Sequence, residues 1–248
     1  MNIKAILFDY GNTLISTRLD WNQVLRENIG NLIRTIKTTL PTIDTIQLVQ
    51  DFLFLRAIGK QRATHEWIET TAETSLAQAL ALQGWSAVEP QIIRQGVDAF
   101  FAPEERLYAP VKGVPEMLNT LSSAGLKLAL VSNATSGRLI RRSLSKAQLA
   151  PYFDQVVVSA DLGICKPNPA IFTHVMRALQ VEVASAIMVG DRLDTDIAGA
   201  QAAGIRSVLA NFFDDEASVH PDGPQPEAIV NHPHDLVELI YTWMESNV

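Results

Sequence analysis

Cysteine is almost absent from this sequence, and so are the long apolar runs of membrane proteins. The single Cys165 in 248 residues excludes an internal disulfide framework and fits a reducing compartment. No apolar stretch reaches the roughly 18 to 20 residues that a membrane-spanning helix needs. After Met1 the chain goes directly into a predicted strand, without a signal-peptide pattern. We therefore expect a cytoplasmic protein that has no membrane partner.

Positive charge is scarce as well. The 20 lysines and arginines are outnumbered by 27 acidic residues, which gives a formal net charge of −7. A nucleic-acid backbone is therefore not an expected partner, and a small anionic substrate would need local help from a basic side chain or a metal ion. Apolar residues make up 47% of the chain and charged residues 19%, which predicts a sizeable core and no disorder.

Most of the chain alternates between strand-like and helix-like patterns. Short apolar, β-prone runs lie at residues 3–8, 126–132, 155–159, 186–190, 207–210 and 228–230. Patterns of helical periodicity lie between them, at residues 114–124, 136–146, 169–179, 195–203 and from 234 onwards. Such alternation is typical of βαβ units. We predict an α/β core with a Rossmann-like, mostly parallel sheet, and a loop at residues 214–226 near its crevice.

One long segment after the first strand carries helical periodicity only. We expect its first helix to begin at the N-cap Asp20 and to stop at Pro41, and its second to end near Gly59. A third is expected at residues 64–82 and a fourth from 89 onwards. About ninety residues are too many for a loop between two strands of a compact sheet. We therefore predict an inserted, all-helical, four-helix domain at residues 16–109, with a core of residues 1–15 and 110–248.

Polar residues follow three of the predicted strands. Asp9 ends the first strand, and Ser132 and Asn133 end the strand at residues 126–132. Asp191 ends a later strand, and Asp196 follows it five residues on. Because ligands of parallel α/β sheets bind outside the carboxyl ends of the strands, we expect these side chains to line one crevice.

Several of these residues also have purely structural explanations. Asp9 before Gly-Asn is ordinary turn chemistry, Ser132 can cap a helix, and Lys166 before proline can be a solvated surface lysine. Asp191 is harder to explain in this way, because it belongs to three acids within residues 191–196 that repel one another unless a cation lies among them. Two strand-end carboxylates beside a lysine and phosphate-binding donors suit Mg²⁺.

Taken together, these stretches resemble the four ordered motifs of the haloacid dehalogenase-like (HAD) hydrolase superfamily. The motifs are Asp9-Tyr10-Gly11-Asn12-Thr13-Leu14, then Ser132-Asn133, then Lys166-Pro167, and finally Gly190-Asp191 with Asp196. The resemblance runs through the whole chain, and the helical insertion lies where the C1-type cap of the subfamily IA phosphatases sits. It is specific for the superfamily and not for a substrate.

The resemblance implies a role in catalysis for four positions. Asp9 would be the nucleophile that forms an aspartyl-phosphate. Ser132 and the N–H of Asn133 would bind the transferring phosphoryl group. Lys166 would bind the phosphate and balance the charge on Asp9. Two residues of the first turn would also contact the phosphate, namely Gly11 and Asn12.

The resemblance also implies a Mg²⁺ site and reveals one departure from the family pattern. Asp9, Asp191 and the backbone carbonyl of Gly11 would hold the ion, with Asp196 acting through water. Most phosphatases of the family carry a general acid–base Asp two residues after the nucleophile, where this chain has Gly11. Neither Gly11 nor Asn12 can transfer a proton, and such help is typically worth about 10² to 10⁴ in rate.

Three functions remain open at this point. We expect a Mg²⁺-dependent hydrolase that dephosphorylates a small phosphorylated metabolite, either with a good leaving group or with an acid–base group from the cap. The candidates for cap specificity are expected at the turn between the second and third cap helices; they are Arg56, Lys60, Arg62 and His65. The alternatives are a 2-haloacid dehalogenase, which needs no metal, and a non-catalytic phosphate-binding or regulatory protein. The protein is expected to be a monomer or a homodimer.

Overall fold

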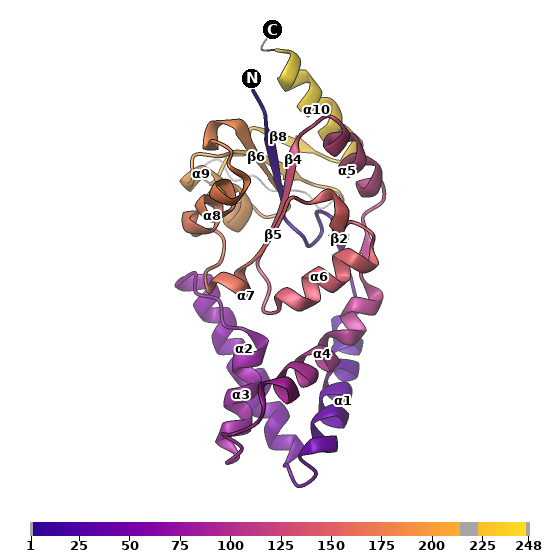
Figure 1. Ribbon diagram of the computed structural model, residues 1–248, viewed down its shortest axis with the longest axis vertical. Helices are drawn as coiled ribbons and strands as arrows, with labels where there is room; N and C mark the ends of the chain where they lie inside the picture. The colour runs from indigo at the N-terminus through magenta and orange to yellow at the C-terminus, as the bar shows by residue number, and fades with distance from the viewer. Residues whose placement is uncertain (1, 214–222, 247–248) are drawn as a thin grey trace.

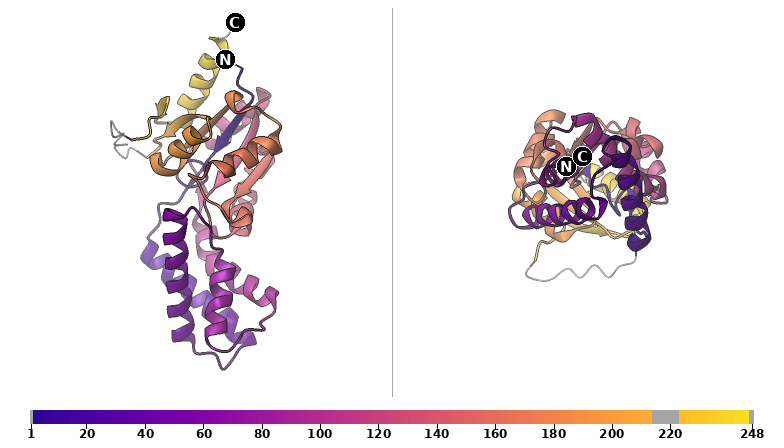
Figure 2. Two further views of the ribbon diagram at one scale, coloured as in Figure 1. Left: turned by 90° about the vertical axis from the view of Figure 1, so that its left-hand side faces the viewer. Right: turned by 90° about the horizontal axis from the view of Figure 1, so that it is seen from below.

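The computed structural model describes residues 2–213 and 223–246 (Figure 1). A part that contains the sheet lies at one end of the molecule, and a helical unit, formed by α1–α4, lies at the other (Figures 1 and 2). The C-terminal helix α10 (Pro233–Glu245) lies on the side of the sheet away from the helical unit. Most of the expected loop, residues 214–222, lies outside the described residues. Among the described residues, no helix has the length and apolar content needed to span a membrane.

The main sheet is parallel throughout, as the sequence predicts. In the described part of the chain it has six strands in the order β5-β4-β1-β6-β7-β8. The strands are β1 (Ala5–Phe8), β4 (Lys127–Ser132), β5 (Gln155–Val158), β6 (Ala186–Gly190), β7 (Arg206–Ala210) and β8 (Ala228–Val230). β1 lies between β4 and β6, where the order of the strands reverses, and such a switch point opens a ligand crevice at the carboxyl ends.

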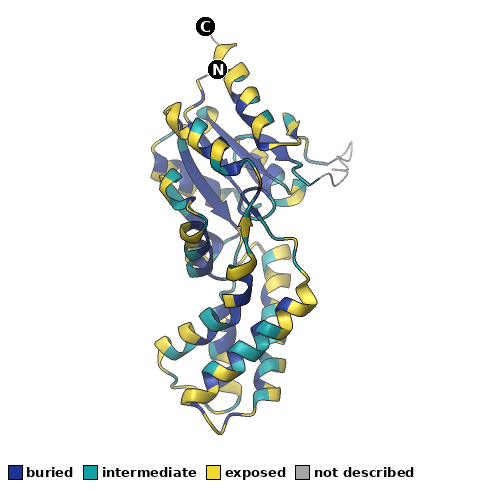
Figure 3. Ribbon diagram, turned by 90° about the vertical axis from the view of Figure 1, so that its right-hand side faces the viewer, coloured by how far each residue is buried: buried dark blue, intermediate teal, exposed yellow. Residues whose placement is uncertain are grey.

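Helices cover both faces of this sheet, which is why its strands are almost entirely apolar. Ile6 and Phe8 pack on one face, and Ala5 and Leu7 on the other. The first face is covered by α5 (Val114–Ser123), α6 (Gly137–Lys146) and α10, and the second by α8 (Pro169–Leu179) and α9 (Ala198–Ala202). Figure 3 shows the strands as a buried layer between more exposed helices.

Short helical turns complete the sheet part. They are η1 (Ala150–Tyr152), α7 (Ser159–Leu162), η2 (Val183–Ser185) and η3 (Leu193–Ile197). The helix predicted at residues 195–203 differs from the observed one, because it begins as the π-helical turn η3. The carbonyl of Arg192 accepts hydrogen bonds from the N–H groups of both Asp196 and Ile197, which widens this turn. The widened turn lies at the end of β6, next to Asp191.

The helical unit has a hydrophobic core of its own. Its helices are α1 (Trp21–Thr39), α2 (Thr45–His65), α3 (Ala72–Leu82) and α4 (Pro90–Leu107). Asp20 caps α1 as predicted, through hydrogen bonds from the N–H groups of Asn22 and Gln23. α1 and α4 pack along each other, and α2 packs against α3.

The second and third helices of this unit are predicted wrongly. α2 continues through Gly59 to His65, and α3 begins only at Ala72, with Thr71 as its N-cap. Gly59 allows close packing instead of ending the helix, because a Cβ there would lie 3.0 Å from Cβ of Thr70. The candidates Arg56, Lys60, Arg62 and His65 therefore lie along α2 and not in a turn.

Two junctions connect the helical unit to the sheet part. Where the chain enters and leaves the unit, β2 (Ile15–Ser16) and β3 (Ala109–Pro110) form an antiparallel pair. At the second junction, Ile68 bridges to Ile164, and the Glu69 N–H donates to the Gly163 carbonyl at 3.0 Å. The segment between α2 and α3 is thus docked on the loop that precedes Lys166.

Candidate active site

Asp9 stands at the centre of the sheet's carboxyl edge. Its N–H donates to the Val189 carbonyl of β6 at 2.9 Å, which continues the β1–β6 ladder by one residue. The side chain is nearly buried, and its Oδ1 lies 2.5 Å from Nζ of Lys166. The carboxylate is therefore fixed at the switch point by both backbone and side chain.

Lys166 is a fully buried lysine held by three oxygen atoms. Its Nζ contacts Oδ1 of Asp9 at 2.5 Å and Oδ1 of Asp196 at 2.7 Å, and it donates to the Val131 carbonyl at 2.6 Å. Burial alone lowers the pKa of Lys166, but the carboxylates of Asp196 and Asp9 outweigh this and raise it above its usual value. The ammonium group thus stays charged, and the surface-lysine explanation is wrong.

Asn133 fixes the backbone of that lysine. Its Nδ2 donates to the Lys166 carbonyl at 2.8 Å, and its Oδ1 accepts from the Lys166 N–H at 2.8 Å. The sequence indicates only a role for the Asn133 N–H, so this pair of side-chain bonds is an additional finding. Ser132 precedes it as the last residue of β4 and is almost completely buried. The structure thus brings the second and third motifs together.

Two further carboxylates lie close to that of Asp9. One oxygen from each of Asp9, Asp191 and Asp196 lies within 4.8 Å of the other two. Burial, followed by the Asp9 and Asp196 charges, raises the pKa of Asp191 to about 7. Burial also raises the pKa of Asp196 to about 6, against the opposing effect of Lys166. Ionising all three acids is therefore costly without a further cation.

Gly190 makes this cluster possible. A Cβ at that position would lie 2.3 Å from Oδ2 of Asp196, closer than any real contact. The same oxygen accepts a hydrogen bond from the Arg192 N–H at 3.1 Å. The Gly-Asp pair at the end of β6 thus has a packing reason, because only glycine lets Asp196 reach Lys166.

The donor set fits a Mg²⁺ ion. All three side chains offer carboxylate oxygens, which are the ligands that Mg²⁺ prefers, usually one or two together with water and phosphate oxygens. The single ammonium of Lys166 cannot neutralise three carboxylates. A divalent cation at this position would balance the remaining charge and would lower the raised pKa values of Asp191 and Asp196.

Hydrogen bonds within residues 12–17 close the turn that follows β1. Oδ1 of Asn12 accepts from the N–H and hydroxyl of Thr17 at 3.2 and 2.9 Å, and the Asn12 N–H donates to the Ile15 carbonyl at 2.7 Å. Asn12 has φ 52°, a conformation that asparagine tolerates better than most residues. Its Nδ2 is the group that remains for the predicted phosphate contact. The φ angle of Gly11, in contrast to that of Asn12, is outside the left-handed region.

The cap candidates do not come together. Lys60, Arg62 and His65 are exposed, and Arg62 forms a surface ion pair with Glu66 at 3.2 Å. Arg56 differs, because its guanidinium is enclosed by the rings of Phe52, Phe100 and Phe101.

Sequence reasoning missed two acids of the helical unit, the half-buried Glu69 and the buried Glu104. Glu69 Oε2 accepts a hydrogen bond from the Ser159 hydroxyl at 2.6 Å, and Glu104 accepts from Asn28 at 2.8 Å and from Tyr108 at 3.0 Å. Burial raises the pKa of both carboxyl groups. Glu104 continues the apolar face of α4, so helical periodicity could have revealed its burial. Nothing in the sequence around Glu69 signals its contact.

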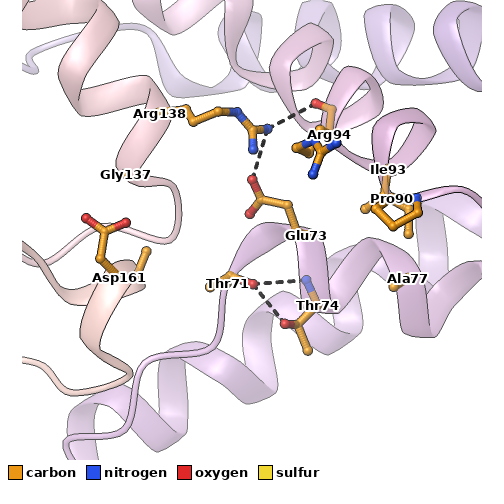
Figure 4. Close-up of a pocket in the computed structure, with 11 residues that line it drawn as sticks. Thr71, Glu73, Thr74, Ala77, Pro90, Ile93, Arg94, Gly137, Arg138 and Asp161 are labelled. Atoms are coloured by element: carbon orange, nitrogen blue, oxygen red, sulfur yellow. Dashed lines mark hydrogen bonds and ion pairs between the residues drawn. The ribbon is translucent and has the colours of Figure 1, made fainter.

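A groove of about 460 Å³ lies between the helical unit and α6 (Figure 4). In it, Arg138 points toward Glu73 and pairs with that residue at 3.0 Å. Arg138 also pairs with Asp98 at 3.0 Å, so its charge is already compensated. Asp9, Lys166, Asp191 and Asp196 do not line this groove. It therefore is a feature of the junction and not the candidate active site.

Comparisons with known proteins agree with this geometry. The model of the haloacid dehalogenase-like hydrolases matches residues 3–204. The chain is 28% identical over 244 residues to the glyceraldehyde 3-phosphate phosphatase of Methanopyrus kandleri, covering 96% of this chain and 97% of that protein. It is 32% identical over 159 residues to the phosphoserine phosphatase of Thermus thermophilus, covering 64% and 60%. Its fold is similar to that of a 2-haloacid dehalogenase from Pseudomonas syringae, with a TM-score of 0.71, 22% identity, and coverage of 97% and 99%.

Proposed function

The chain belongs to the haloacid dehalogenase-like hydrolases, and from this premise we propose that it is a Mg²⁺-dependent phosphatase of a small phosphorylated metabolite. The observation that carries the proposal is the cluster of Asp9, Asp191 and Asp196 around the buried Lys166. Relatives named as phosphatases of small phosphorylated compounds support it. The chemistry is a substitution at phosphorus, in which positioning and electrostatic stabilisation do most of the catalysis.

In the first step, a carboxylate oxygen of Asp9 forms a bond to phosphorus as the bond from phosphorus to the leaving oxygen breaks. Water then attacks the phosphorus of the aspartyl-phosphate, which releases inorganic phosphate and restores Asp9. The Lys166 ammonium, the Ser132 hydroxyl and the Asn133 N–H would stabilise the charge of the phosphoryl oxygens. Asn133 also positions Lys166 through its two side-chain hydrogen bonds.

The metal would be held by Asp9, Asp191 and the backbone carbonyl of Gly11, with Asp196 contributing through water. Bound Mg²⁺ would supply a positive charge to the phosphoryl oxygens and orient them. The metal-free dehalogenase alternative gives no reason for gathering three carboxylates, so we favour the phosphatase. A non-catalytic phosphate-binding protein would retain this cluster, and the assays below distinguish it.

We further propose that residues 16–109 act as a cap on a core of residues 1–15 and 110–248. The pair of β2 and β3 is the two-stranded link about which the cap would move. Closure would exclude water from the aspartyl-phosphate and select the substrate. We expect the enzyme in the cytoplasm, as a monomer or a homodimer.

The missing acid at Gly11 predicts a strong dependence on the leaving group. We expect aryl and acyl phosphates to be hydrolysed at least about 10²-fold faster than alkyl phosphates, because no side chain at position 11 can protonate the departing oxygen. The measurement is kcat/KM with Mg²⁺ across phosphate esters whose leaving groups span a wide range of pKa.

Three outcomes would each contradict one part of this proposal. Equal rates across the series would show that another group supplies the proton. Halide release from a 2-haloacid without metal would favour the dehalogenase alternative. Phosphate binding without turnover of any ester would identify a binding protein.

Metal binding should depend on pH through Asp191. Burial, followed by the Asp9 and Asp196 charges, raises the pKa of Asp191 from its usual 3.8 to about 7, so its ionisation destabilises the metal-free fold as pH rises between these values. Mg²⁺ binds the ionised form and should raise the melting temperature more at pH 8 than at pH 5.5. Thermal unfolding with and without Mg²⁺ at both pH values measures this. An equal shift at both would contradict a role of Asp191 in metal binding.

A further inference from the structure

Arg56 is a partly buried cation, and one of its guanidinium nitrogens lacks a hydrogen-bond partner among the described residues. Its guanidinium carbon lies 4.9, 5.0 and 5.6 Å from the ring centres of Phe100, Phe101 and Phe52. Its Nη1 is shielded from solvent and donates to no partner among the residues that the structure describes. Ring faces attract the charge but do not satisfy N–H donors, and leaving a buried donor unsatisfied is destabilising. Such a group requires an explanation.

The two acids near Arg56 are already occupied by other donors. Glu104 receives hydrogen bonds from Asn28 and Tyr108 on its two oxygens, and Glu69 receives one from the Ser159 hydroxyl. Both acids act on Arg56 through their charge, and in the part of the chain that the structure describes neither of them forms an ion pair with it. The guanidinium is thus held in place by rings and by longer-range attraction, while its Nη1 is left without a partner among the described residues.

Arg56 also lies between two elements that lead to the catalytic loops. On one side, Tyr108 stacks edge-on against Tyr10, the residue that follows Asp9, with ring centres 6.0 Å apart. On the other side, Glu69 contacts Ser159, whose Oγ accepts from the Ala134 N–H at 2.9 Å, two residues after Ser132. Glu69 and Tyr108, whose charges act on Arg56, thus connect it to the segments around both Asp9 and Ser132.

We infer that Arg56 binds a carboxylate on the organic part of the substrate, so that the preferred substrate is a small phosphate ester that also carries a carboxylate. This inference rests on the proposed phosphatase function. A planar guanidinium pairs with a carboxylate through two parallel hydrogen bonds, which would satisfy the open donors. The phosphate would lie at Asp9 in the core and the carboxylate at Arg56 in the cap, so one ligand would join the two parts.

The test uses three esters with the same two-carbon skeleton: 2-phosphoglycolate, glycolaldehyde phosphate and ethyl phosphate. The wild type should prefer 2-phosphoglycolate over ethyl phosphate by about 10²-fold in kcat/KM, because a desolvated charge pair forms only with the first. Arg56→Met, which keeps the aliphatic contacts with the rings, should abolish this preference and leave ethyl phosphate hydrolysis within about threefold. Arg56→Lys keeps the charge but loses the planar pair of N–H donors, so it should give an intermediate preference for 2-phosphoglycolate.

A structural role would give different results. If Arg56 only stabilised the cap, Arg56→Met would lower the melting temperature and reduce all three activities equally, which would overturn the inference. Loss confined to glycolaldehyde phosphate would also overturn it, in favour of an uncharged carbonyl. We expect the melting temperature of Arg56→Met to be unchanged or higher, because an unpaired buried charge has been removed. Arg34→Met, an exposed arginine of α1, is the matched control and should match the wild type. Absence of wild-type activity on these three esters and on an aryl phosphate with Mg²⁺ would instead refute the phosphatase function itself.

Discussion

Replacing Asp9 by Asn should reduce phosphatase turnover by at least about 10³-fold, because the amide cannot act as the nucleophile at phosphorus. The substitution keeps the shape of the side chain at the end of β1. It removes one of two acids that contact Lys166, and Asp196 at 2.7 Å and the Val131 carbonyl at 2.6 Å remain. The variant should therefore fold, and kcat with an aryl phosphate and Mg²⁺ is the measurement.

Asp194→Asn provides the matched control for that variant. Asp194 belongs to the same acidic stretch as Asp191 and Asp196, yet it is exposed and pairs with Arg192 at 2.6 Å. Asp194→Asn should change turnover by less than about twofold, since exposed ion pairs contribute little to stability. If Asp9→Asn retained activity near that of the control, Asp9 would have no covalent role.

Installing an acid at position 11 should restore activity on poor leaving groups. Gly11→Asp is expected to raise kcat/KM for alkyl phosphates by about 10²-fold and to change that for aryl phosphates much less. The position accepts a side chain, because a Cβ there would lie 3.5 Å from Cγ2 of Thr17, an ordinary contact. The backbone of Gly11 is outside the left-handed region, so no strain is expected. The same ester series measures the effect.

Gly11→Asn is the control for this gain. It has the shape of the aspartyl side chain without a proton to transfer, so it should leave the leaving-group dependence unchanged. A fourth acid adds repulsion to the cluster, and we expect Gly11→Asp to melt lower than Gly11→Asn in the absence of Mg²⁺. An equal gain in both variants would contradict proton donation. A well-folded Gly11→Asp without any gain would contradict the proposed cause of the weak alkyl activity.

The architecture of the sheet part was predictable because its physical signals are local. Runs such as residues 126–132 are apolar throughout since helices cover both faces of the sheet, and the alternation of elements indicates parallel pairing. The boundary of α2 was not predictable, because Gly59 serves packing against Thr70 rather than termination. Periodicity cannot distinguish these two uses of glycine. The docking of Ile68 on Ile164 is a long-range contact without a pattern in the sequence.

The sequence indicates which residues gather at the candidate site, but not the burial of Lys166 or the hydrogen bonds among these residues. Strand ends placed Asp9, Ser132 and Asp191 at one edge, which follows from topology alone. The burial of Lys166 and the side-chain bonds of Asn133 depend on how loops fold over that edge. Residues of the helical unit were the least predictable, because exposed and partly buried arginines of α2 look alike in sequence. Only the structure separates Arg56 from Arg62.

The most direct test of the central claim is a crystal structure of the protein with Mg²⁺ and fluoroberyllate, a mimic of the phosphoryl group. Our account predicts beryllium bonded to a carboxylate oxygen of Asp9, fluorides in contact with Lys166 and Ser132, and Mg²⁺ between Asp9 and Asp191. Mg²⁺ bound elsewhere, or fluoroberyllate away from Asp9, would contradict it.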